Sequence, residues 1–174
     1  GCTVNFVGST DGTINTENFY RMNINKSAGT RELERANQIS FADNAVCTIA
    51  ENLTISNGTL RIPNNCQITV NNDLVVDDNN FTMTGTTPST VTVAGEIALS
   101  EFGEINLGTT GILISNSAFI QNGNLFVNGG SFTSHGNYSL TPGGSLQITD
   151  GSFICDAPYI QFQVANLNGE FILS

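Results

Sequence analysis

The sequence lacks tryptophan and is poor in basic residues, of which it has five among 174 residues. No lysine or arginine follows Arg61, whereas residues 62–174 carry nine aspartates and glutamates. A surface of this charge repels nucleic-acid phosphates and anionic lipid headgroups. The composition therefore argues against nucleic acid and membrane surfaces as partners, and the missing tryptophan removes one aromatic platform on which sugars stack.

Long hydrophobic runs, helical periodicity and closely spaced cysteine pairs are also absent. Without a run of about 18 apolar residues, the chain is not expected to insert into a membrane. No window places apolar residues at i, i+3, i+4 and i+7, which argues against helices of useful length. No Cys-x-x-Cys motif or Cys/His cluster indicates zinc, and no cofactor is predicted.

A short pattern recurs along most of the chain instead: a turn residue, a spacer, and then two apolar residues separated by one position. Gly123-Asn124-Leu125-Phe126-Val127 is one example. The spacings between the leading apolar residues are 21, 24, 20, 21 and 25 for Leu60, Phe81, Ile105, Leu125, Leu146 and Phe171. Such a period of short strands predicts a solenoid, in which each repeat buries its apolar face against its neighbours.

Two further apolar pairs precede this one in each repeat, as in Leu53/Ile55 and Ile68/Val70. A later repeat offers Ala118/Ile120 at the position of Leu53/Ile55. Three alternating strands per coil predict an all-β, three-faced parallel β-solenoid of about six to seven coils. The regular array is expected over residues 39–174. Residues 1–38 are expected to form an N-terminal cap or irregular first coil, with a helical turn over residues 31–36.

One stretch of the chain resembles known proteins. It consists of two segments, Asn18-Phe19-Tyr20-Arg21-Met22-Asn23-Ile24-Asn25-Lys26-Ser27 and Asn52-Leu53-Thr54-Ile55-Ser56-Asn57-Gly58-Thr59-Leu60. Their sequence pattern resembles that of repetitive extracellular proteins of Bacteroidetes-like bacteria. Those proteins are predicted to be β-solenoid adhesins and surface proteins. Arg21-Met22 replaces their usual Asn-Leu, and no functional residue is carried over. The resemblance implies an extracellular or cell-surface location in a bacterium.

The ends of a solenoid bear unpaired strand edges that natural β proteins usually cover. The candidate edges here contain Val4 and Phe6 at one end and Phe171, Ile172 and Leu173 at the other. The sequence predicts that the last coil of one copy stacks on the first coil of the next, an open contact that propagates into a filament.

Four cysteines in a secreted-looking chain indicate disulfides, with three possible complete pairings. Cys47 and Cys66 precede strands of adjacent coils and are predicted to form a bond within the subunit. Cys2 and Cys155 lie at opposite ends of the stack and are predicted to bond between subunits. The alternative is that Cys2 folds back onto Cys47 or Cys66 and leaves free thiols.

Carboxylates gather near one predicted turn. Asp77 and Asp78 precede Glu101 and Glu104 by about one coil, so these four are weak candidates for calcium ligands, with a solvated acidic turn as the alternative. Glu101 and Glu104 are also nominal candidates for a glycosidase pair. His135 is expected to be a turn residue, and no enzyme is predicted.

The predicted function is therefore that of a structural subunit of an extracellular filament, with further copies of the chain as its partners. The main alternative is a ligand- or glycan-binding fragment of a larger adhesin, for which surface glycans are the partner.

Overall fold

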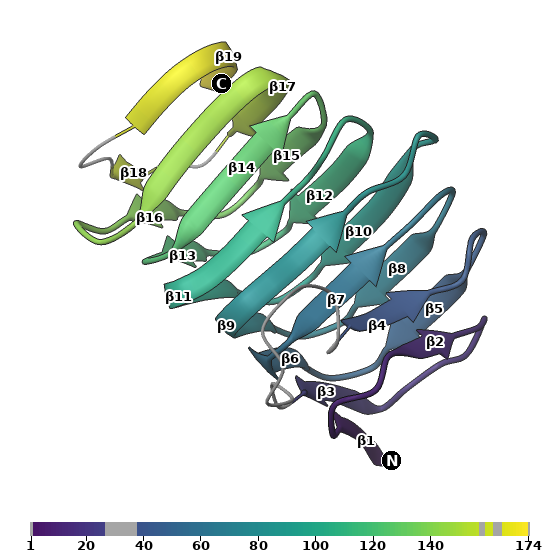
Figure 1. The fold of residues 1–174 in the computed structure, drawn as a ribbon. Coiled ribbons are helices and arrows are strands. Elements are labelled where there is room, and N and C mark those ends of the chain that lie inside the picture. Colours follow the sequence, from purple (N-terminus) through teal and green to yellow (C-terminus); the bar gives the residue numbers. More distant parts are fainter. Residues whose placement is uncertain (1, 27–37, 157–158, 162–164, 174) are drawn as a thin grey trace.

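The computed structural model describes residues 2–26, 38–156, 159–161 and 165–173, the last range as a backbone path. The described chain is built of β-strands alone, stacked in parallel as a β-solenoid of about seven turns (Figure 1). This confirms the predicted fold class. The strands lie on three faces, and each strand between the two end coils pairs with the equivalent strands of neighbouring coils.

The first face begins each coil, and the second follows it after a corner. The first face contains β1 (Thr3–Val7), β3 (Arg21–Asn25), β6 (Leu53–Asn57), the first parts of β9 (Leu74–Met83) and β11 (Ile97–Asn106), β13 (Phe119–Gln121), β16 (Tyr138–Leu140) and β18 (Ile160–Gln161). The second contains β2 (Gly12–Ile14), β4 (Gln38–Phe41), β7 (Thr59–Ile62), the second parts of β9 and β11, β14 (Asn124–Asn128), and the first parts of β17 (Ser145–Cys155) and β19 (Ala165–Leu173).

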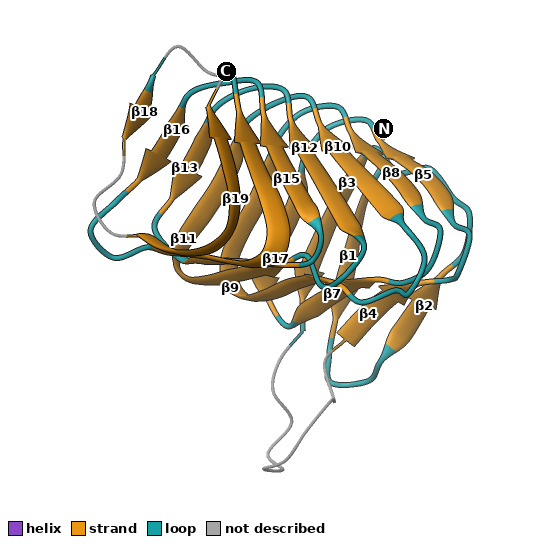
Figure 2. Ribbon diagram, turned by 90° about the horizontal axis from the view of Figure 1, so that it is seen from above, coloured by secondary structure: helices purple, strands orange, loops and turns teal. Residues whose placement is uncertain are grey.

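The third face closes each coil, and its strands lie side by side in Figure 2. It contains β5 (Val46–Ile49), β8 (Gln67–Val70), β10 (Ser89–Val93), β12 (Gly111–Ser115), β15 (Ser131–Ser134) and the second parts of β17 and β19.

The core follows from the alternation of side chains along these strands. Every other residue points inward, so equivalent residues of successive coils form buried columns. On the second face this column is fully buried and confirms the predicted repeat for Leu60, Phe81, Ile105, Leu125 and Leu146. In the C-terminal half the core is aromatic, with ring centroids 4.9–5.4 Å apart among Phe119, Phe132, Tyr138 and Phe153.

Polar side chains bond from coil to coil at the corners. The Nδ2 of Asn65 donates to Oδ1 of Asn44 at 2.9 Å, and Asn79 donates in the same way to Asn57 at 3.0 Å. Asn44 and Asn65 have positive φ values of 64° and 53°, a conformation that asparagine tolerates better than most residues. Asparagine at these corners therefore both makes the turn and links one coil to the next.

One repeat has a different register from the prediction. Ile97 pairs with Phe119 and Leu99 with Gln121, so the inward residues of β13 are Phe119 and Gln121 rather than Ala118 and Ile120. Ile120 points outward and is 38% exposed. The observed register places the Phe119 ring 5.4 Å from the Tyr138 ring in the core, which buries more apolar surface than an inward Ala118 would.

The last predicted repeat is also shifted. Leu146 pairs with Ala165, whereas Phe171 pairs with Phe153 on the third face. Phe171 therefore does not continue the column that ends at Leu146, and the predicted spacing of 25 residues is wrong. The alternating segment at the start of β19 occupies the second face instead.

The region before residue 39 contains strands that pair with the next coil. Val4 pairs with Met22 in parallel, and Gly12 pairs with Ile39, so β1 and β2 form a coil in register with the next one. Of the two alternatives predicted for residues 1–38, a cap or an irregular first coil, these strands form part of a first coil. The predicted helical turn over residues 31–36 lies outside the described residues.

Candidate functional sites

The N-terminal coil leaves part of its apolar interior open. Val4 and Phe6 occupy inward positions, and both are only half-buried. Their partners one coil further on, Met22 and Ile24, are 0% exposed. Within the described chain, β1 pairs with a strand on one side only, so this coil presents a strand edge together with half-exposed core residues.

Lys26 holds the first coil in place. Its side chain is only 3% exposed, and its ammonium donates hydrogen bonds to the carbonyl oxygens of Val7, at 3.2 Å, and Thr10. The first carbonyl ends β1, and the second lies in the turn that joins β1 to β2. A buried cation is stable only when its hydrogen bonds are satisfied, so this contact fixes the turn and thereby the position of the open edge.

The C-terminal coil also has an edge strand. Within β19, Phe171, Ile172 and Leu173 pair in register with Phe153, Ile154 and Cys155. Among the described strands, none pairs with β19 on its other side. The structure thus places the two predicted edges at opposite ends of the stack (Figure 1).

The predicted disulfide between Cys47 and Cys66 is not formed. Cys47 pairs with Ile68, so Cys66 lies two residues before the position opposite Cys47. Cys47 and Cys66 are therefore free thiols. The predicted bond between Cys2 and Cys155 is also unsupported, because the side chain of Cys155 is 0% exposed and points into the core. Cys2 is exposed, and burial raises the pKa of the Cys47 thiol to about 12.

The predicted carboxylate cluster is dispersed. Asp78 pairs with Phe102, whereas Glu104 pairs with Asn80 further along the strand. Asp77 and Glu101 lie on the same corner, but no group of three His, Cys, Asp or Glu residues in the described chain can hold a metal ion. Desolvation raises the pKa of Glu104. The geometry therefore does not assemble the four proposed calcium ligands.

His135 has a carboxylate partner that the sequence did not indicate. It follows β15 directly, and its Nδ1 lies 2.7 Å from Oδ2 of Asp156, which follows β17. The two side chains are 45% and 40% exposed, and an ion pair at such a surface contributes little to stability. The pair links two successive corners, and its position after the strands agrees with the expected turn.

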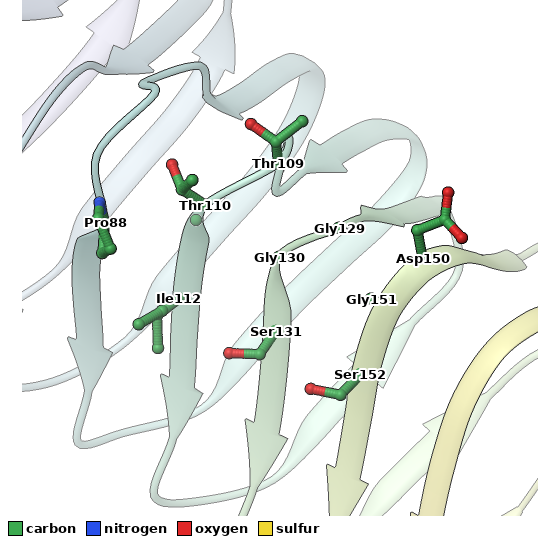
Figure 3. A pocket seen from close by; sticks show the side chains of 11 residues that line it. Pro88, Thr109, Thr110, Ile112, Gly129, Gly130, Ser131, Asp150, Gly151 and Ser152 are labelled. Carbon is green, nitrogen blue, oxygen red and sulfur yellow. The ribbon is translucent and has the colours of Figure 1, made fainter.

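A groove runs across the corner between the second and third faces. Its cavity volume is about 660 Å³, and its lining comes from four successive coils, from Pro88 to Ser152. Figure 3 shows the side chains of Ser131 and Ser152 projecting in the same direction from neighbouring strands, with Thr109 and Asp150 at the rim. Sequence reasoning missed this groove. The available signal was the repeated Gly-Ser pair at Gly130-Ser131 and Gly151-Ser152.

No helix in the described part of the chain is long and apolar enough to cross a membrane. No protein-family model matches the chain, and neither the curated proteins nor the solved structures contain a significant match.

Proposed function

We propose that the chain is a structural subunit of an extracellular bacterial filament, in which the C-terminal coil of one copy stacks on the N-terminal coil of the next. The observation that carries this proposal is the half-buried state of Val4 and Phe6 at inward positions of β1. A further coil placed against β1 would complete their burial. Its strand would also form hydrogen bonds with the open edge of β1, in the same parallel arrangement that joins neighbouring coils within the stack.

The energetics require the whole coil to take part. Fully burying a Val or Phe side chain is worth about 1.5–3 kcal/mol, so completing the burial of two half-buried residues contributes about 1 kcal/mol each. Association costs at least about 4 kcal/mol in lost freedom of motion. Backbone hydrogen bonds along the open strand edges, each worth about 0.5–1.5 kcal/mol net, supply the difference.

Charge and strand direction favour head-to-tail contacts. Residues 1–61 have five basic against six acidic residues, whereas residues 62–174 have nine acidic residues and no lysine or arginine. Contact between two C-terminal ends brings two strongly acidic halves together and is opposed by repulsion. Head-to-tail contact avoids this repulsion and continues the parallel pairing of β1 with β3.

The extracellular location rests on the resemblance of residues 18–60 to repetitive surface proteins and on a composition rich in uncharged polar residues, with 11% charged residues. The disulfide predicted between subunits is not part of the proposal, because Cys155 is buried in the core.

Negative-stain electron microscopy and sedimentation velocity on the purified chain test the proposal. We expect fibres whose length increases with protein concentration and with salt, since salt screens the acidic surface. Phe6→Asp should abolish the fibres, because it places a charge in the stacking surface. Asn5→Asp is the matched control, as it adds the same charge on the outward side of the same strand.

Loss of fibres by Phe6→Asp is informative only if the variant still folds, which circular dichroism shows when the β-strand signal equals that of the wild-type chain. If that signal is lost, Val4→Ser provides a milder change at the same edge and should raise the critical concentration for assembly. Wild-type chains that stay monomeric at every concentration and salt level would overturn the proposal.

A further inference from the structure

The groove between the second and third faces has the features of a binding site on the wall of the solenoid. It lies on the wall rather than at the open edges of β1 and β19, and it extends from Pro88, which immediately precedes β10, to Ser152 on β17. Its volume of about 660 Å³ is within the range of roughly 300–1,000 Å³ that is typical of small-ligand sites. It does not depend on stacking, so its role is independent of filament formation.

Several polar groups in the groove have no partner within the described chain. The hydroxyls of Ser131 and Ser152 make no hydrogen bond to described residues, and the Asp150 carboxylate makes none either. Thr110, on the same groove, differs because its hydroxyl donates to the carbonyl oxygens of Gly85 at 2.9 Å and Thr87 at 3.2 Å. Within the described chain both serine hydroxyls are therefore unbonded, whereas Thr110 shapes the wall.

The available hydroxyls are regularly spaced. Ser131 and Ser152 are direct partners in the parallel pairing of β15 with β17, which places them about 4.8 Å apart along the stack. Ile112 precedes them in the same outward column and supplies an apolar surface next to the hydroxyls. A ligand that fits this arrangement is elongated, runs along the stack, and alternates hydroxyls with apolar C–H surface.

Charge decides which ligands of this kind fit. Asp150 lies at the rim (Figure 3), and no lysine or arginine follows Arg61 in the sequence. The site therefore has no cation to neutralise a carboxylate, sulfate or phosphate on a sugar. We infer that the groove binds an extended, uncharged oligosaccharide through the hydroxyls of Ser131 and Ser152, with Asp150 accepting hydrogen bonds from sugar hydroxyls.

Isothermal titration calorimetry of the wild-type chain with cellohexaose tests this inference, with an oligogalacturonate of the same length as the acidic comparison. We expect cellohexaose to bind and the acidic oligomer to bind at least tenfold more weakly. The double variant Ser131→Ala/Ser152→Ala should weaken cellohexaose binding about tenfold, since it removes two hydrogen bonds.

Thr133→Ala is the matched control, because Thr133 is an outward residue of the same strand that does not line the groove. It should leave the affinity unchanged. Three results would each overturn the inference: no binding of cellohexaose, binding that the double serine variant does not weaken, or tighter binding of the acidic oligomer. Since the groove lies on the wall, any of these results can occur whether or not the chain forms fibres.

Discussion

Removing the hydroxyl of Tyr138 provides a direct test of how the C-terminal core is held together. Tyr138 and Gln121 are both 0% exposed, and the Tyr138 hydroxyl donates to Oε1 of Gln121 at 2.5 Å. The Gln121 amide in turn donates to the carbonyl oxygens of Gly123, at 3.1 Å, and Ser145, at 2.7 Å. Gln121 thus joins three neighbouring segments from a position that leucine occupies in adjacent coils.

Tyr138→Phe preserves the ring and its packing but withdraws the donor from the buried Gln121 oxygen. A buried acceptor that loses its partner costs about 1–3 kcal/mol, and we expect this decrease in the free energy of unfolding. The measurement is urea unfolding followed by circular dichroism. The slope with urea concentration should be unchanged, because the variant exposes no additional surface on unfolding.

A double-mutant cycle with Gln121→Leu separates the hydrogen bond from other effects of the tyrosine. In the Gln121→Leu background the acceptor is gone, so Tyr138→Phe should cost less there by about 1–3 kcal/mol. Equal costs in both backgrounds, or a cost below about 0.3 kcal/mol in the wild-type background, would refute the view that this bond stabilises the core.

Three other predictions follow from the same structure. Gly123→Ala should lower stability in thermal melts by about 1–3 kcal/mol, because a Cβ there would lie 2.2 Å from the carbonyl oxygen of Gly103. Gly143→Ala is the control and should be tolerated, because the nearest atom to its added Cβ lies at 3.5 Å. A thiol reagent such as Ellman's should modify Cys2 at once and the buried cysteines only as fast as the chain opens; a second fast thiol would contradict the burial. Because burial raises the pKa of Cys47 to about 12, its thiolate forms first in the unfolded chain, so stability should fall as pH rises from about 9 towards 12, and Cys47→Val should lessen that decrease.

Much of the fold could be predicted because three-residue strands at a fixed period leave a clear pattern. Leu60, Phe81 and Leu125 align in the sequence as they do in the structure. The pattern failed at Ala118 and Ile120 because the neighbouring residues Phe119 and Gln121 offer an equally regular alternation. Only the packing of the Phe119 ring and the hydrogen bonds of Gln121 decide between the two registers.

The sites were harder to predict, since they depend on which residues successive coils bring together. A shift of two residues decides whether Cys47 meets Cys66 or Ile68. Two residues that line the groove, Ser131 and Ser152, are 21 positions apart in the sequence but adjacent on the third face. The two serines share only the repeated Gly-Ser pair, and the spacing of the apolar residues does not reveal whether their hydroxyls are already bonded.

The corner between the first and second faces shows where this chain can accommodate additional sequence. One residue, Gly58, separates the paired strands at this corner in one coil, since Asn57 pairs with Asn25 and Thr59 with Gln38. In the preceding coil, residues 26–37 separate the same two partners along the chain, yet β3 still pairs with β6, with one register shift between Ile24 and Asn25, and β4 with β7. Strand pairing on both faces therefore persists although the two coils differ in the number of residues between the paired strands, and the entropic cost of closing a loop in general grows only slowly with its length. A peptide or small domain grafted here would leave the stack intact, which makes this corner the natural place for the chain to diversify or to be engineered for display.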